Sequence, residues 1–186
     1  MQAIEALLTR RSARSLTGPA PDQGALDLIF ASAARAADHG RLRPWRFILI
    51  QAAARERFGA LLAEHLRRAH PGSSEEALQR ERQKAFRAPL IVVVAAVVDP
   101  EAKIPAIEQI LAAAAAAQNV MLASFALGLN AMWKTGGAAY DESVKAALGL
   151  APKDAIVGFL YLGAEAGAPA PRAETAWRDR VQHWSG

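Results

Sequence analysis

Residues 88–98, APLIVVVAAVV, decide the fold. The run is continuously apolar and rich in β-branched residues, with no polar position alternating through it. Such a run is typical of a strand that is covered on both faces. We therefore predict a strand here, in the middle of a sheet.

Three further apolar segments predict strands. One run of β-formers follows Pro44, a shorter run ends in a glycine turn, and the last lies near the carboxyl end of the chain. We expect these strands at residues 46–51, in NAMWKTGG at 130–137, and in AIVGFLYLG at 155–163.

Helical periodicity covers much of the remaining chain. Asp22 is an expected N-cap, and Gly128 is expected to close the longest helix. The expected helices span residues 1–9, 23–37, 53–69, 74–86, 107–127 and 141–148.

The helix at 107–127 carries six consecutive alanines, which give it a smooth side for close packing of another helix. Its apolar composition also raises the possibility of a membrane span. Alanine adds little transfer free energy, and the region contains polar side chains, so we interpret it as a buried helix. These polar residues are Glu108, Gln109, Gln118 and Asn119.

Composition restricts the class of protein. The chain has 186 residues, of which 52% are hydrophobic and 22% charged, so we expect one folded domain over residues 1–186. It has no cysteine, which excludes disulfides, thiolate nucleophiles and cysteine-ligated metal centres. The net charge of +4 suits an anionic ligand as well as a nucleic acid. The amino-terminal MQAIEALLTRRS does not have the pattern of a secretory signal, and we expect a cytoplasmic protein.

The segment 164–186 is mostly polar but contains Trp177 and Trp184. Such a segment cannot build a core of its own. We expect it to wrap over its own domain or over a partner subunit, and a frayed tail is the alternative.

A basic cluster lies in TRRSARSL, residues 9–16. Arg10 and Arg14 lie four positions apart with Ser12 between them, so two guanidinium groups and a hydroxyl could surround one phosphate. A solvated basic helix end is the alternative. The chain has no glycine-rich phosphate loop of the dinucleotide or nucleoside-triphosphate type.

Two other segments carry polar and aromatic residues. In RAADHGRLRPWRF, Arg35 is expected at the end of a helix, and His39 could be a ligand contact, a proton donor or a loop histidine. In WKTGG, Lys134 and Thr135 could close on an anion while Trp133 packs under an aromatic ligand, although a routine strand end would look the same. The four histidines are scattered without metal-ligand spacing, and no Ser/His/Asp triad is indicated.

These segments occur together and in order. RRSAR, RAADHGRLRPWRFILIQ, FRAPLIVVVAA, GLNAMWKTGG and IVGFLYLG resemble the nitroreductase family of flavin mononucleotide (FMN) oxidoreductases, in particular its short YdjA-type branch. The resemblance spans about residues 1–163. It implies an α+β fold with a mixed, mostly antiparallel sheet flanked by helices, in an intertwined homodimer with FMN at the subunit interface. The tail would then reach the partner subunit.

The resemblance also implies three FMN-binding segments, one of them partly contributed by the partner subunit. Many relatives carry arginine at the position of Lys134, so the phosphate would be held less rigidly here. The implied residues are Arg10, Arg11 and Ser12, with Arg14 beside them, then Arg35 and His39, and finally Trp133, Lys134 and Thr135.

The implied activity is hydride transfer from NADH or NADPH, through FMN, to a small electron-poor acceptor such as a nitroaromatic or a quinone, in a ping-pong cycle. His39 is the candidate proton donor, and no metal, nucleic acid or membrane is required. We expect the segment 70–86 to help form the pocket.

Two alternatives stay open. The same scaffold could support enone reduction, dehydrogenation or flavin fragmentation. A colourless, basic module could instead bind nucleic acid through the arginines at 10, 11, 14, 41, 43 and 46, with an affinity that falls steeply with salt.

Overall fold

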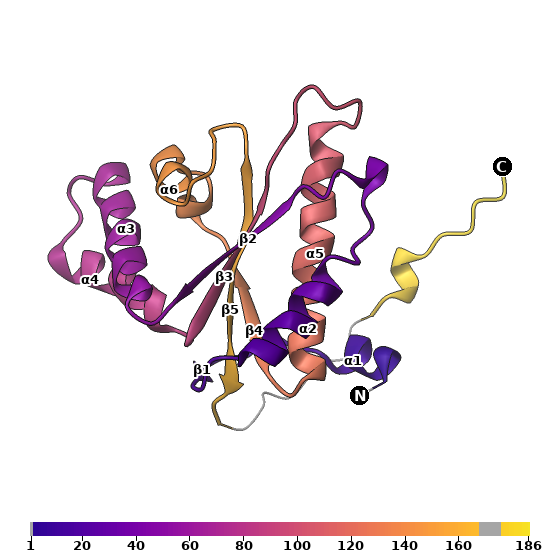
Figure 1. The fold of residues 1–186 in the computed structure, drawn as a ribbon, viewed down its shortest axis with the longest axis horizontal. Coiled ribbons are helices and arrows are strands. Elements are labelled where there is room, and N and C mark those ends of the chain that lie inside the picture. Colours follow the sequence, from indigo (N-terminus) through magenta and orange to yellow (C-terminus); the bar gives the residue numbers. More distant parts are fainter. Residues whose placement is uncertain (1, 168–175) are drawn as a thin grey trace.

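A five-stranded sheet lies between two layers of helices in the computed structural model, which describes residues 2–167 and 176–186 (Figure 1). β5 pairs with β1, β3 and β4, and β2 pairs with β3, always antiparallel. The strands are β1 (Leu16–Thr17), β2 (Trp45–Gln51), β3 (Leu90–Ala96), β4 (Asn130–Lys134) and β5 (Ala155–Glu165). The predicted α+β fold with a mostly antiparallel sheet flanked by helices is confirmed.

The central strand is β3, and every one of its residues is fully buried. Its alternate side chains enter two different cores: Ile91 and Val93 pack on one face of the sheet, and Val92 and Val94 pack on the other. The continuous apolar run therefore reflects cover on both faces, as predicted.

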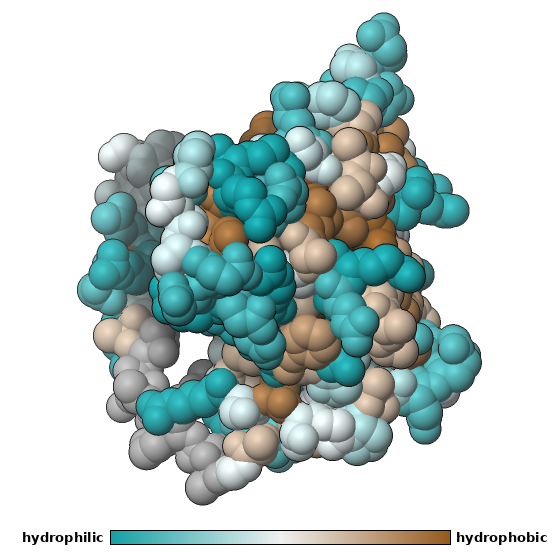
Figure 2. All heavy atoms as spheres, turned by 90° about the vertical axis from the view of Figure 1, so that its left-hand side faces the viewer, coloured by the Kyte–Doolittle hydropathy of each residue, from teal (hydrophilic) through white to brown (hydrophobic). Residues whose placement is uncertain are grey.

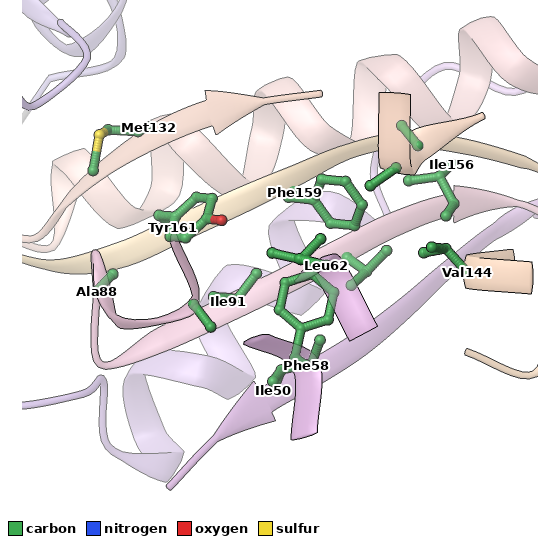
Figure 3. Close-up of a cluster of buried hydrophobic side chains, with 14 of the residues drawn as sticks. Ile50, Phe58, Leu62, Ala88, Ile91, Met132, Val144, Ile156, Phe159 and Tyr161 are labelled. Atoms are coloured by element: carbon green, nitrogen blue, oxygen red, sulfur yellow. The ribbon is translucent and has the colours of Figure 1, made fainter. Parts of the chain in front are cut away.

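Helices cover each face of the sheet (Figure 1). Side chains of α2 (Gln23–Ala33) and α5 (Ala106–Ala126) form the core on one face. On the other face, Phe58 and Leu62 of α3 (Ala54–Ala69) meet Phe159 (Figure 3). The remaining helical segments are α1 (Ala3–Thr9), α4 (Glu75–Gln83), α6 (Glu142–Ala147), and the short turns η1 (His39–Arg41), η2 (Lys84–Phe86), η3 (Gly137–Ala139) and η4 (Arg178–Arg180).

α2 ends four residues earlier than predicted. The Arg35 amide bonds the Ser32 carbonyl at 3.1 Å, which tightens the last turn, and the Asn119 side-chain amide of α5 donates to the same carbonyl at 3.1 Å. A tertiary contact therefore uses a carbonyl near the helix end, and Arg35 lies in a turn after the helix. β1 was not predicted, because a strand of two residues is too short to show an alternation of apolar and polar residues.

α5 packs against α2 and the sheet, and four of its six consecutive alanines are buried. Among the described helices, α5 alone is long and apolar enough to cross a membrane, a property that the core helix of a folded domain shares. Its contacts here are those of a core helix.

Residues 168–175 of the predicted tail lie outside the described residues. Beyond them, Trp177 is 57% exposed and Trp184 is 93% exposed, and the segment extends away from the α5 side of the sheet (Figure 1). The tail's contact with a partner subunit stays a prediction, as does the single domain over residues 1–186.

Candidate functional site

The segment between α1 and β1 runs beside β4. Ser12 forms an isolated parallel bridge with Ala131, and the Ala13 amide donates to the Ala131 carbonyl at 3.2 Å. α1 ends at Thr9 because Arg10 turns to an extended conformation, while Ala13 and Leu16 are buried and hold the segment against the sheet. The bridge places the predicted phosphate-binding cluster next to the strand that leads into WKTGG.

Arg11 is paired within the chain. Its guanidinium forms a salt bridge with Glu165 of β5, which also accepts a 3.1 Å hydrogen bond from Asn130, and it lies 5.9 Å from the ring centre of Phe125. These contacts join the cluster to β4, β5 and α5. One terminal nitrogen of Arg11 is thus used by a carboxylate, and its contact with FMN stays a prediction.

A cleft of about 420 Å³ opens at the end of β4. Lys134 and Thr135 line it on the β4 side, with the glycine turn that follows them. The side of the molecule that carries α3, α4 and α6 shows hydrophilic side chains with hydrophobic ones between them (Figure 2). The cleft's volume falls within the range of small-molecule sites, about 300–1,000 Å³.

The facing walls of the cleft come from α3, α4, η2 and β5 and from residues next to them. Leu62, Leu66 and Phe159 supply apolar surface, and the polar side chains are His65, His70, Glu81, Lys84, Arg87 and Tyr161. His70, Glu81 and Lys84 belong to the segment 70–86, which was expected to help form a pocket.

His65 is oriented by Asp141. The imidazole Nδ1 lies 2.9 Å from Asp141 Oδ2, and the other Asp141 oxygen accepts hydrogen bonds from Arg68 at 3.1 Å and from the Val144 amide at 2.9 Å. Burial would raise the pKa of Asp141, but the hydrogen bonds from His65 and Val144 and the Arg68 charge outweigh it and lower that pKa. Asp141 thus fixes the imidazole and caps α6 with the same carboxylate.

Tyr161 projects from β5 on the same face as Phe159 (Figure 3). Its side chain is only 3% exposed, and burial raises its pKa to about 12, with smaller effects from the Arg87 and Glu81 charges. The hydroxyl therefore stays protonated at neutral pH.

Arg35 and His39 do not line the cleft. Arg35 borders a separate, mostly apolar groove between α1, α2 and α5. The His39 side chain is 64% exposed, and its Nδ1 lies 2.5 Å from the Glu108 carboxylate of α5. Within one chain the second predicted segment is thus separate from the cleft.

The other predicted residues lie near β4. Trp133 is half-buried, with its indole Nε1 donating to the Val157 carbonyl at 3.2 Å, and Arg14 is exposed. Among the residues that the structure describes, no three acidic or histidine side chains gather as metal ligands.

Sequence reasoning missed His65, Arg87 and Tyr161. Tyr161 lies in an apolar strand, and its position resembles that of any core residue. His65 meets Asp141 across 76 positions of sequence, so no local spacing signals the pair. Arg87 lies three positions before β3, and a charged residue between a helical segment and a buried strand was the available signal.

Comparison with known proteins identifies the family. A sequence profile of the Nitroreductase family matches residues 7–164. The chain is 39% identical over 163 residues to YdjA of Escherichia coli (strain K12), a candidate NAD(P)H nitroreductase, and the match covers 88% of each chain.

Solved structures of nitroreductase-like proteins have a similar fold. A nitroreductase-like family protein from Bacillus cereus has a TM-score of 0.84 at 26% identity, over 100% of this chain and 97% of the other. A candidate nitroreductase in complex with FMN from Desulfovibrio desulfuricans has a TM-score of 0.76 at 25% identity, over 99% and 97%. The resemblance seen in the sequence is confirmed, and the chain belongs to the nitroreductase family.

Proposed function

We propose that the protein is an FMN-dependent oxidoreductase that takes hydride from NADH or NADPH and reduces nitroaromatic, quinone or similar electron-poor acceptors by a ping-pong mechanism. The Ser12–Ala131 bridge carries this proposal, because it joins the first predicted FMN-binding segment to the strand that leads into Trp133, Lys134 and Thr135, about 120 residues away in sequence. The E. coli relative, a candidate NAD(P)H nitroreductase, and the FMN complex of the D. desulfuricans protein support it.

The donor set suits a flavin phosphate. Arginine, lysine and hydroxyl groups are the usual ligands of a phosphate that carries close to two negative charges. We assign Arg10, Ser12 and Lys134 to the phosphate, with Arg14 and Thr135 beside them, and Trp133 to the strand that supports this end of the site.

When bound, FMN supplies the chemistry, accepting hydride from the nicotinamide and passing reducing equivalents to the acceptor. The chain's own residues would bind and orient the flavin and shield it from water. Leu62, Leu66 and Phe159 line the cleft with apolar surface and limit the access of water. His39 is the candidate proton donor; Glu108 holds its Nδ1, so its Nε2 would carry the transferred proton.

We further propose that the active unit is a homodimer formed through α1, α2 and α5. These helices expose apolar side chains and border a groove of about 460 Å³. Apolar patches of this kind mark interaction sites. The exposed residues are Ile4, Leu7, Leu8, Leu28, Ile107 and Leu111.

The proposed dimer would also explain why Arg35 and His39 lie away from the cleft of their own subunit. Arg35 borders the α1–α2–α5 groove and His39 contacts α5, so both lie where a second subunit would pack. We propose that each subunit contributes these residues, and its tail with Trp177 and Trp184, to the partner's side of the assembly.

An absorption spectrum of the purified protein tests the function. Flavin bands are expected, and anaerobic addition of NADH and NADPH in separate samples should bleach them and identify the preferred donor. Stopped-flow reoxidation by a nitroaromatic or a quinone then tests the acceptor half of the cycle. A protein that stays colourless after incubation with FMN would contradict the proposal.

A further inference from the structure

Ser12, which the proposed function assigns to the flavin phosphate, is anchored to the sheet on both sides. On one side, the Ala13 amide donates to the Ala131 carbonyl of β4 at 3.2 Å. On the other side, the Arg11 guanidinium forms a salt bridge with Glu165, the last residue of β5. Each anchor lies one residue from Ser12, so together they fix its backbone.

Glu165 is also held by the first residue of β4. The Asn130 side-chain amide donates to the same carboxylate oxygen, Oε2, at 3.1 Å, and the Asn130 Oδ1 accepts a hydrogen bond from the Ala131 amide at 2.7 Å. Asn130 is buried and Glu165 is half-buried, so little water competes for these bonds. The backbone of Ala131 therefore contacts Asn130 through its amide and the Ser12 segment through its carbonyl.

The Arg11 side chain turns into the protein. Its Nε is buried and has no hydrogen-bond partner among the residues that the structure describes, so a ligand in the solvent does not reach this atom. Its guanidinium carbon lies 5.9 Å from the centre of the Phe125 ring of α5, a distance at which the ring face attracts a cation. Glu165 and Phe125 together hold the guanidinium against β5 and α5.

The side chains on either side of Arg11 point the other way. In an extended segment, successive side chains alternate between two faces. Arg11 and Ala13 turn toward the protein, and Ala13 is buried, whereas Ser12 between them is exposed. Arg10 begins the segment in an extended conformation, so we expect its side chain to leave the backbone on the same face as Ser12.

We propose that the Arg11 side chain is a positioning group and not a ligand of the flavin phosphate. Glu165 and Asn130 hold it, and through it they fix the segment from which Arg10 and Ser12 reach the phosphate. The resemblance to the family places Arg11 in the flavin site, and the salt bridge with Glu165 gives its side chain this different task. The effect on flavin binding rests on the proposed function, whereas the coupling of Arg11 to Glu165 does not.

A double-mutant cycle on the full chain tests this role. Flavin-free protein is titrated with FMN and with riboflavin, which lacks the phosphate, and flavin fluorescence gives each dissociation constant. Arg11→Gln and Glu165→Gln should each weaken FMN binding by about tenfold, and the double variant should bind FMN no more weakly than either single variant. Riboflavin binding should change much less, because the segment that is released holds the phosphate.

Two further variants complete the set. Asn130→Ala removes the second donor to Glu165 and should weaken FMN binding severalfold. Arg67→Gln is the matched control, because Arg67 is an exposed arginine paired with Glu64 on α3, and it should leave the affinity for both flavins unchanged.

Exchange of the two charges separates positioning from direct binding. Arg11→Glu places two carboxylates together and should weaken FMN binding strongly, whereas Arg11→Glu combined with Glu165→Arg restores an ion pair and should recover at least tenfold of that loss. If position 11 faced the phosphate, its carboxylate would repel FMN in both variants and nothing would be recovered. Circular dichroism melts check that the exchanged variant folds, and the cycle with glutamine decides if it does not.

The positioning role and the proposed function fail separately. Additive losses, or a loss in Arg11→Gln ten times that in Glu165→Gln, would return Arg11 to the phosphate, and unchanged FMN affinity in both single variants would also overturn the positioning role. A wild-type protein that binds no flavin would refute the proposed function instead. The same cycle measured by urea denaturation would then decide whether Glu165 holds Arg11, because additive free energies of unfolding would overturn that coupling.

Discussion

Trp133 shows how single residues shape the end of β4. Its indole Nε1 donates to the Val157 carbonyl, and the next residue of β5, Gly158, leaves the space that the ring occupies. A Cβ on Gly158 would lie 2.2 Å from the indole Nε1, a distance that real contacts do not reach. The missing side chain at position 158 therefore positions the tryptophan that precedes Lys134.

Gly158→Ala is expected to displace Trp133 and to destabilise the protein by about 1–3 kcal/mol, the usual cost of overpacking a core. Urea unfolding followed by tryptophan fluorescence measures this. Gly72→Ala is the matched control, because no atom lies within 4 Å of its added Cβ. Equal stability of both variants would contradict the role of Gly158.

Arg10→Ala should weaken FMN retention by more than tenfold, because a bound phosphate forms charge-assisted hydrogen bonds of about 1.5–3 kcal/mol each. Fluorescence titration of the flavin-free protein with FMN gives the dissociation constant. Arg67→Ala, which removes an arginine from the exposed side of α3, should leave it unchanged. Undiminished occupancy in Arg10→Ala would remove this residue from the proposed phosphate site.

At the scale of elements, α6 depends on a single carboxylate. Asp141 is its N-cap and also joins it to α3 through His65 and Arg68. The element carries only six residues, fewer than an isolated helix needs for stability in water. Its position next to the cleft therefore rests on the cap and on tertiary contacts.

Asp141→Ala is expected to cost about 2 kcal/mol at pH 7, the upper end for loss of a helix cap, because the contacts with α3 are lost as well. Asp22→Ala, which removes the exposed cap of α2, should cost about 1 kcal/mol and is the matched control. Chemical denaturation of both variants gives the difference.

The Asp141 contribution should also depend on pH. Its pKa is lower in the folded state than the ordinary value of 3.8, so the charged carboxylate stabilises the protein above about pH 4. This part of its contribution is lost as the pH falls through the folded value, and the stability gap between wild type and Asp141→Asn should close there. A gap that widens toward pH 3 would contradict this.

At the scale of the whole molecule, the two helical layers differ in how completely they are covered. α3 presents its apolar side chains to the sheet. In contrast, α1, α2 and α5 leave several apolar side chains exposed to solvent beside the groove that Arg35 borders. This asymmetry motivates the proposed dimer.

Leu111 is 58% exposed on α5, and Leu111→Glu would place a charge in the proposed interface. We expect this variant to become monomeric and to lose FMN, since part of the flavin site would come from the partner. Light scattering coupled to size exclusion measures the mass. Tyr140→Glu, at a 75% exposed position outside these helices, should keep the wild-type mass. A dimeric, fully flavinated Leu111→Glu would place the interface elsewhere.

The spacing of apolar residues along the sequence predicted most of the helices and strands. The run at 88–98 became β3, and Asp22, Ser74 and Asp141 cap helices close to the predicted starts. The longest helix ends as expected before Gly128, whose φ is +83°. These features depend on neighbours within a few positions, which periodicity and capping chemistry describe directly.

The sequence by itself determined the central strand, the helical segments and, through the order of its motifs, the family. The tertiary structure alone decided what meets at the cleft: Ser12 beside Ala131, His65 on Asp141, and Tyr161 facing the same space as Arg87. It also ended α2 early through Asn119 and separated Arg35 from the cleft. Strand register and helix packing set such distances, and no local pattern encodes them because the partners lie tens of residues apart.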